Sequence, residues 1–321
     1  MSKLTFEPFA LHETGSWPAA YHRFDENSIG AVTASVLSNR PLLIRGEPGS
    51  GKSQLARAVA QVWDRMFISL VVNSQTESHD LHYSFDTLAR LADAQAAATI
   101  VRESDSGGAL LDPRKYLCPS VLWYAFDWDS AVEALELCEH KKLVPACPQG
   151  WKPEHGTVVL IDEIDKAEIE LPNDLLETIG NGGFSVPWIN KTISTQEENP
   201  SFIVITTNDE RELPPAFIRR CVVLNLNPPR EDEELILWLV DRGKVHFNQD
   251  LEEIDDDIFE RAARLLSANR TKSIELGLPP VGQAEYLDLI RVLSKIERNK
   301  QEEALETISP YILEKYPDMS A

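Results

Sequence analysis

The chain has 321 residues, of which 43% are hydrophobic and 26% charged, so it is long and apolar enough to bury a large core. Its formal net charge of −21 disfavours nucleic acid as a direct partner, because no Lys/Arg-rich run offers a local basic patch. No stretch approaches the roughly 18 apolar residues of a membrane span, no signal peptide follows Met1, and the four cysteines form no C-x-x-C pair. We therefore expect a cytoplasmic protein with reduced thiols and no membrane partner.

Three segments precede the first strong motif. Residues 1–28 are a mixed stretch with several aromatic side chains. We expect them to form an N-terminal strap that either covers an edge of the core or packs beside a nucleotide. Residues 28–37 read as a helix, and the apolar run 41–45 reads as a strand.

The first strong motif follows this strand directly and fits G-x-x-x-x-G-K-[ST] at every fixed position. It consists of Gly46, Glu47, Pro48, Gly49, Ser50, Gly51, Lys52 and Ser53, and a helical pattern begins at Gln54. Glycines let the backbone N–H groups approach a phosphate, and the new helix adds its dipole. We expect residues 46–54 to bind the nucleotide, with Lys52 at the β- and γ-phosphates and Ser53 on Mg²⁺. The alternative is a glycine-rich turn that binds nothing.

The segment between this motif and residue 156 is less regular. Residues 67–73 read as a buried strand and residues 88–94 as part of a helix. Residues 121–126 are rich in aromatic side chains, which favour plain core over a partner contact. Residues 131–138 have helical spacing, and a loop follows at 145–156.

The second strong stretch is residues 157–165. Four apolar residues, 158–161, predict a buried strand that ends in two adjacent carboxylates, Asp162 and Glu163. We expect Asp162 to hold Mg²⁺ and Glu163 to polarise the attacking water as a general base. Alone, such a pattern is also typical of a strand followed by an acidic surface. Asp165 is expected to cap the following helix.

Another apolar run, residues 202–208, predicts a buried strand that ends in Asn208, after a short hairpin at 184–186 and 192–194. Asn208 is expected to orient the attacking water or touch the γ-phosphate, unless it only forms a turn. Arg219 and Arg220 end a very short helix before the strand 222–226. Either one pairs with an acid of its own chain, or it reaches a neighbour's γ-phosphate as an arginine finger.

Buried strands that alternate with helices predict a doubly wound parallel α/β domain, which we bound at residues 29–228. From residue 229 to 321 the strand pattern gives way to an all-helical domain. We expect four helices there, near 231–246, 251–268, 283–296 and 302–315.

With these motifs in this order, the sequence resembles the AAA+ ATPases over roughly residues 28–296, and within them the MoxR-like branch. The resemblance assigns residues 46–53 to Walker A, 160–163 to Walker B, Asn208 to sensor 1 and Arg220, or else Arg219, to the arginine finger. Segments 80–91, 162–176 and 212–221 look like one bacterial MoxR-like subgroup. The helical domain corresponds to the family's lid.

The resemblance implies an ATP-hydrolysing ring, commonly a hexamer, in which the finger acts on the adjacent subunit. It also implies chaperone-like remodelling of a protein partner, often beside a von Willebrand A-type protein. Adenine as the base rests on this resemblance too, since a P-loop contacts phosphates.

One departure concerns the basic residue that many relatives carry near the start of the third lid helix. The corresponding segment, 278–285, contains no Arg or Lys, and Lys272 lies upstream in an uncertain register. A second function is therefore open, a nucleotide-gated scaffold or switch that recruits or restrains an effector with little turnover. A nucleic-acid-associated NTPase is a third possibility, against which the net charge argues.

Overall fold

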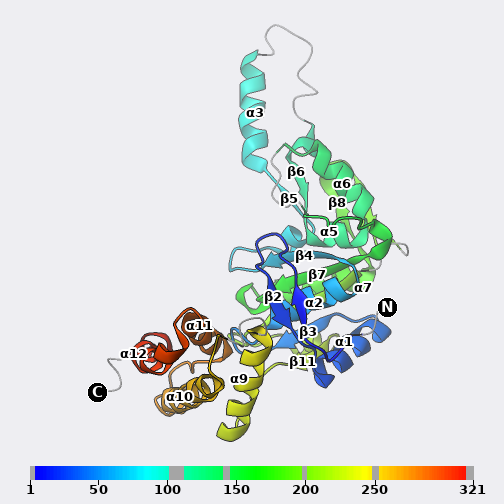
Figure 1. The fold of residues 1–321 in the computed structure, drawn as a ribbon. Helices are drawn as coiled ribbons and strands as arrows, with labels where there is room; N and C mark the ends of the chain where they lie inside the picture. The colour runs from blue at the N-terminus through cyan, green and yellow to red at the C-terminus, as the bar shows by residue number, and fades with distance from the viewer. Residues whose placement is uncertain (1–3, 101–111, 140–144, 197–200, 248–252, 316–321) are drawn as a thin grey trace. The chain divides into compact units, whose positions relative to one another are not determined.

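The computed structural model describes residues 4–100, 112–139, 145–196, 201–247 and 253–315, which form two compact units (Figure 1). The first unit contains Gly30–Ile44 and Ala56–Leu224. The second contains Leu4–Ile29, Arg45–Leu55 and Asn225–Ala321. The P-loop motif thus belongs to the same unit as the N-terminal segment and the C-terminal helices.

A five-stranded sheet in the order β11-β3-β10-β7-β4 is the centre of the first unit. β4 and β10 pair in parallel with β7, so that Met66 and Ser201 both lie opposite Thr157. Val158, Val159, Leu160 and Ile161 of β7 have no exposed surface, which explains the unbroken apolar run of this central strand. The strands are β3 (Leu42–Arg45), β4 (Met66–Val71), β7 (Thr157–Asp162), β10 (Ser201–Thr207) and β11 (Val222–Asn225).

Helices flank this sheet, which confirms the predicted α/β fold class (Figure 1). All six residues of α5 are buried, and α5 packs against β7 and β4. The aromatic stretch 121–126 is therefore core, and its Trp123 indole donates a hydrogen bond to Ser130 Oγ at 3.1 Å. The helices described before the C-terminal ones, of which α3 stands apart from the central sheet in Figure 1, are α1 (Glu26–Ser38), α2 (Lys52–Val62), α3 (Thr87–Ile100), α5 (Val121–Phe126), α6 (Trp128–Leu137), α7 (Glu170–Asn181) and α8 (Pro215–Ile218).

Two short antiparallel pairs complete the first unit. The predicted hairpin is present as β8 (Gly183–Val186) and β9 (Lys191–Ser194), with Phe184 opposite Ile193. β5 (Tyr83–Phe85) pairs with β6 (Leu117–Pro119), a contact between distant segments that the local pattern did not predict.

The second unit contains the four C-terminal helices around their own apolar cluster. They are α9 (Asp232–His246), α10 (Asp256–Glu275), α11 (Gln283–Leu293) and α12 (Gln301–Leu313). The expected start of the second helix near residue 251 is wrong, because Asp255 is its N-cap and accepts a hydrogen bond from Asp257 N–H. Residues 248–252 lie outside the described part of the chain.

The N-terminal segment of the same unit folds as an antiparallel pair, β1 (Phe9–Leu11) and β2 (Ala20–His22), which the sequence analysis did not predict. The Phe9 ring stacks on Phe24 with centroids 5.7 Å apart, and the His22 ring meets Phe24 edge-on at 4.7 Å. These ring contacts fix the path of the chain from β2 towards α1.

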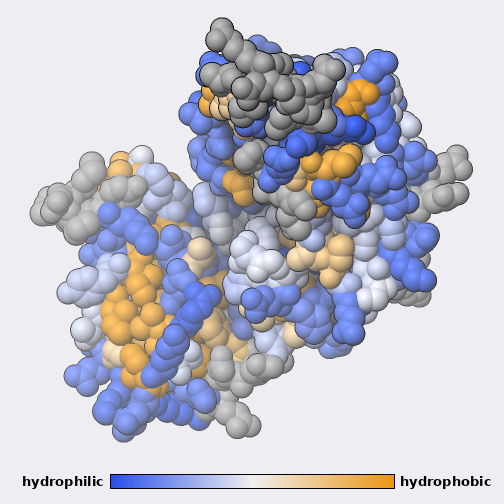
Figure 2. Space-filling model, turned by 90° about the horizontal axis from the view of Figure 1, so that it is seen from above, coloured by the Kyte–Doolittle hydropathy of each residue, from blue (hydrophilic) through white to orange (hydrophobic). Residues whose placement is uncertain are grey.

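Hydrophilic residues cover most of the face shown in Figure 2, with apolar residues gathered in a few places. Within the part of the chain that the structure describes, no helix is both long and apolar enough to span a bilayer.

Candidate functional site

The P-loop, residues 46–53, runs from the end of β3 to the first turn of α2. Gly49 and Gly51 have positive φ angles of 74° and 92°, which non-glycine residues rarely adopt. Lys52 is 6% exposed, and its Nζ donates hydrogen bonds to the carbonyl oxygens of Gly46 at 2.8 Å and Glu47 at 2.9 Å. The loop therefore curls around the ammonium group.

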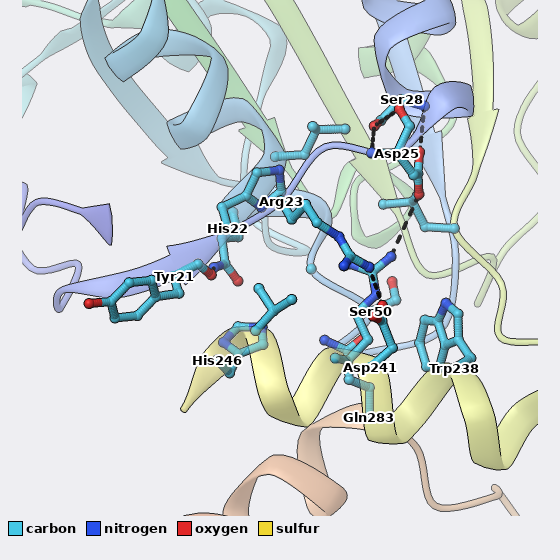
Figure 3. A pocket seen from close by; sticks show the side chains of 16 residues that line it. Tyr21, His22, Arg23, Asp25, Ser28, Ser50, Trp238, Asp241, His246 and Gln283 are labelled. Carbon is cyan, nitrogen blue, oxygen red and sulfur yellow. Dashed lines mark hydrogen bonds and ion pairs between the residues drawn. The ribbon is translucent and has the colours of Figure 1, made fainter. Parts of the chain in front are cut away.

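A cavity of about 130 Å³ lies next to the P-loop within the second unit (Figure 3). Its lining residues from the N-terminal segment include His22 and Asp25, and those from the P-loop are Ser50 and Gly51. The lining also includes Asp241 and His246 of α9 and Gln283 of α11. Gln54 Nε2 donates to the Tyr21 carbonyl oxygen at 2.7 Å and joins α2 to the strap.

Two ion pairs connect the strap to α9 beside this cavity. Arg23 pairs with Asp241, towards which it points in Figure 3. Arg242 pairs with Asp25 at 3.6 Å. Asp25 also accepts the Ser28 N–H at 2.7 Å and so caps the start of α1.

Three polar atoms facing the cavity are buried without a hydrogen-bond partner among the described residues: His22 Nε2, Ser50 Oγ and Gln283 Oε1. Buried polar atoms are normally satisfied, so three orphans around one cavity indicate a ligand with its own donors and acceptors. Burial, aided by Arg242 and His246, lowers the pKa of His22 to about 3, so its imidazole is neutral near pH 7.

The carboxylates predicted at the end of β7 form a second group, in the first unit. Thr206, on the neighbouring strand β10, donates its hydroxyl proton to Asp162 Oδ1 and accepts the Glu163 N–H at 2.9 Å. Glu163 has a positive φ of 62°, a strained conformation for a residue with a side chain. Sequence reasoning missed Thr206, whose only signal was its place near the strand end.

Both oxygens of the Glu163 carboxylate have a partner. Asn208 Nδ2 lies 3.2 Å from Oε1, and Lys166 Nζ lies 2.6 Å from Oε2. The hydrogen bond to Glu163 raises the pKa of Lys166. The structure therefore brings Asp162, Glu163 and Asn208 together. It adds Lys166 to this group, and the spacing of three residues between Glu163 and Lys166 could have predicted their contact.

The expectation that Asp165 caps the next helix is wrong. Ile169 is the N-cap of α7, and Asp165 is 3% exposed within the short 3-10 turn Ile164–Lys166. Its carboxylate accepts the N–H of Glu210 at 2.9 Å and lies 3.4 Å from the N–H of Asn208. Asp165 thus fixes the loop that carries Asn208. Its two partners, Asn208 and Glu210, lie 43 and 45 residues further along the chain.

Arg219 and Arg220 are both exposed just after α8. Within the described part of the chain, neither guanidinium forms an ion pair. Of the alternatives open in the sequence, pairing with an acid of the same chain is thus not what the structure shows.

The structure contains a basic contact from the C-terminal helices that the sequence analysis did not find. Lys272 is exposed, whereas Arg270 on α10 forms a bidentate ion pair with Glu47 of the P-loop. No local pattern marks Arg270, because its partner lies 223 residues away.

The described residues contain no cluster of three or more His, Cys, Asp or Glu side chains arranged to hold a metal ion. That finding is compatible with Mg²⁺, which keeps several waters and takes one or two protein ligands plus substrate phosphates. Ser53 and Asp162 supply oxygen donors of the kind that Mg²⁺ prefers.

Comparison with known proteins adds the family. A search of curated proteins found no match. Among solved structures, a candidate ATPase from Cytophaga hutchinsonii is 13% identical with a TM-score of 0.37, over 89% of this chain and 79% of that one. The model for the AAA domain (dynein-related subfamily) matches residues 41–221, more than half of the 321-residue chain, from the strand before the P-loop to Cys221. The chain therefore belongs to the dynein-related AAA domain family, and so to the AAA+ ATPases.

Proposed function

We propose that the protein binds and hydrolyses ATP, with residues 46–54 around the phosphates. The observation that carries this proposal is the P-loop itself, a curl of positive-φ glycines around the buried Lys52 ammonium. The neighbouring cavity supports it, because the three unpartnered atoms of His22, Ser50 and Gln283 fit a ligand rich in donors and acceptors. Adenine as the base remains an inference from the family.

In this proposal Ser53 and Asp162 hold Mg²⁺, which supplies charge neutralisation for the transferring phosphoryl group. Thr206 orients Asp162 by donating a hydrogen bond to its Oδ1. This arrangement assigns the metal one carboxylate and one hydroxyl from the protein.

Glu163 is the proposed general base and Asn208 its orienting partner. The Glu163 side chain keeps 28% of its surface exposed, so water reaches the carboxylate. Asn208 fixes one carboxylate oxygen, and Lys166 has to yield the other before that oxygen can accept a proton.

The finer identity also belongs to the proposal. We place the protein in the MoxR-like branch, as a cytoplasmic ring, with residues 29–228 as nucleotide-binding domain, 229–321 as lid and 1–28 as strap. Arg220, or Arg219, is the finger towards the adjacent subunit, supported by the exposure of both side chains. Its substrate is a protein partner, remodelled in a chaperone-like manner, with a von Willebrand A-type protein as a candidate.

The ion pair between Lys166 and Glu163 favours a second function, a nucleotide-gated scaffold with little turnover, because it occupies the proposed base. In that case ATP binding recruits or restrains an effector, and hydrolysis serves only to reset the protein.

The decisive experiment compares Glu163→Gln, Lys52→Ala and the exposed control Glu170→Gln by phosphate release and by ATP titration. We expect Glu163→Gln to lose at least about a hundredfold in turnover while still binding ATP, the loss typical of a removed general base. Lys52→Ala is expected to lose binding, and Glu170→Gln neither. Unchanged turnover in Glu163→Gln contradicts the assigned base. Partner recruitment that needs ATP but survives Glu163→Gln favours the scaffold.

A further inference from the structure

Arg270 on α10 and Glu47 of the P-loop form a bidentate ion pair within the second unit. Arg270 Nη1 lies 2.9 Å from Glu47 Oε2, and Nη2 lies 2.5 Å from Oε1. The two side chains retain only 12% and 33% of their exposed surface, so this pair is better shielded from water than an ordinary surface ion pair.

The same guanidinium also holds the turn that precedes α11. Arg270 Nη1 donates to the Val281 carbonyl oxygen at 2.9 Å. Two residues further on α11 begins, and its Ala284 lies so close to Gly49 that a Cβ on Gly49 would be 2.5 Å from Ala284 Cβ. The P-loop is thus contacted by two C-terminal helices at two of its residues.

The Glu47 carboxylate has the same sign of charge as the phosphates that the loop is proposed to hold. Charges in a partly buried site are screened less than charges in water, so an uncompensated carboxylate there opposes phosphate binding. Arg270 neutralises it. The Glu47 main chain matters as well, since its carbonyl oxygen accepts a hydrogen bond from Lys52 Nζ.

We propose that Arg270 is a positioning residue that acts on phosphate binding through Glu47: by neutralising its carboxylate, the C-terminal helices control the charge of the P-loop. When Arg270 holds Glu47, the loop is neutral at this position. When the helices withdraw Arg270, the Glu47 carboxylate repels the nucleotide. This inference rests on the proposed function, because it assumes that residues 46–54 bind a nucleotide.

The test measures binding of Mg²⁺-ATP to the full-length chain by calorimetry at low salt. Arg270→Gln is expected to weaken binding about tenfold, the order expected for one unpaired charge near the phosphates. Removing the carboxylate as well, in Arg270→Gln/Glu47→Gln, is expected to restore binding to within about threefold of wild type. Glu47→Gln alone should bind at least as tightly as wild type, because Arg270 keeps its charge.

Arg264→Gln is the matched control. Arg264 lies on the same helix and pairs with Glu260 and Glu233, but it is half exposed and its pairs do not involve the P-loop. It should bind ATP as wild type does. The affinity lost in Arg270→Gln should also shrink as salt rises, because screening weakens the repulsion.

Equal weakening in Arg270→Gln and in the double variant would overturn the proposal, since the effect would then be a structural one that does not pass through the Glu47 charge. Wild-type affinity in Arg270→Gln, or weaker binding in Glu47→Gln, would overturn it too. Failure of the proposed function looks different: wild type does not bind ATP, or Lys52→Ala binds it unchanged.

Discussion

Thr206 shows how much of the candidate site depends on a single buried hydroxyl. It has no exposed surface, and it links the two carboxylate residues at the end of β7 by donating to Asp162 and accepting from Glu163 N–H. Because Glu163 sits in a left-handed conformation, the hydrogen bond to its N–H helps to hold a strained residue in place.

Thr206→Val keeps the shape of the side chain but removes both hydrogen bonds. We expect a loss of about 1–3 kcal/mol in the free energy of unfolding, because the part-buried N–H of Glu163 loses its partner. We also expect lower ATP turnover, since Asp162 and Glu163 lose their common support. Urea denaturation and phosphate release measure the two effects. Thr206→Ser retains the hydroxyl and should stay close to wild type; a Thr206→Ser defect as large as that of Thr206→Val would contradict this account.

At the scale of structural elements, the P-loop depends on its glycines for two separable reasons. Gly49 and Gly51 both have positive φ, but only Gly49 is also in steric contact, with Ala284 of α11. Apart from its chain neighbours, none of the residues that the structure describes comes within 4 Å of a Cβ built on Gly51. The pair therefore allows backbone strain and overpacking to be measured in the same loop.

Gly51→Ala is expected to lose roughly 1–2 kcal/mol of unfolding free energy, from the left-handed backbone alone. Gly49→Ala should lose a further 1–3 kcal/mol or so from overpacking against Ala284. In the Ala284→Gly background, Gly49→Ala should no longer show the overpacking loss but should still show the loss from the left-handed backbone. Chemical denaturation of the four variants gives the values. Equal losses for the two glycines would show that the contact with α11 is not felt.

The elements that sequence predicted well are those specified locally. The run 158–161, the P-loop and the turn-bounded hairpin each have their signal within about ten residues, as a period or a turn residue does. Arg270 and Asp165 acquire their roles from residues far along the chain, and no periodicity encodes such a contact. The sequence therefore predicts the P-loop and the carboxylates at the end of β7, but it does not predict the residues that support them, such as Arg270 and Asp165.

At the scale of the whole molecule, each unit contains at least one buried or half-buried histidine that opposes protonation. Burial is the main cause that lowers the pKa of His82 to about 4 in the first unit, and of His22 to about 3 and His246 to about 4 in the second. An unfolded chain binds these protons near pH 6.5, whereas the folded units do not. Stability due to the neutral form is therefore complete above pH 6.5 and declines as the pH falls towards 4.

His82→Phe tests this at one position, because a phenyl ring can keep the stack on Phe184. At pH 7 the variant should be less stable by about 1 kcal/mol, having lost the hydrogen bond with Thr178. Between pH 7 and pH 5, however, it should lose about 2 kcal/mol less than wild type, because no imidazole has to be kept neutral. Urea denaturation at the two pH values measures the difference. His79→Phe is the control, because His79 is exposed and its substitution should leave the pH dependence of stability as in wild type. If His82→Phe also loses as much stability as wild type between pH 7 and pH 5, His82 is not a source of that pH dependence.

Assembly is the last property of the whole molecule that the residues address. Arg219 and Arg220 are both exposed, as a finger that reaches the nucleotide of a neighbouring subunit has to be. Arg220→Ala is expected to bind ATP but not hydrolyse it, and Lys52→Ala to do neither. Mixed one to one, about a quarter of the interfaces in a randomly assembled ring join an intact nucleotide site to an intact finger. Phosphate release should therefore reappear in the mixture, at about a quarter of wild-type turnover.

Arg219→Ala in place of Arg220→Ala distinguishes the two arginines, because only the variant of the true finger is inactive alone and complemented by Lys52→Ala. Absence of complementation at every mixing ratio, with both variants shown to assemble with each other, would contradict a finger acting between subunits.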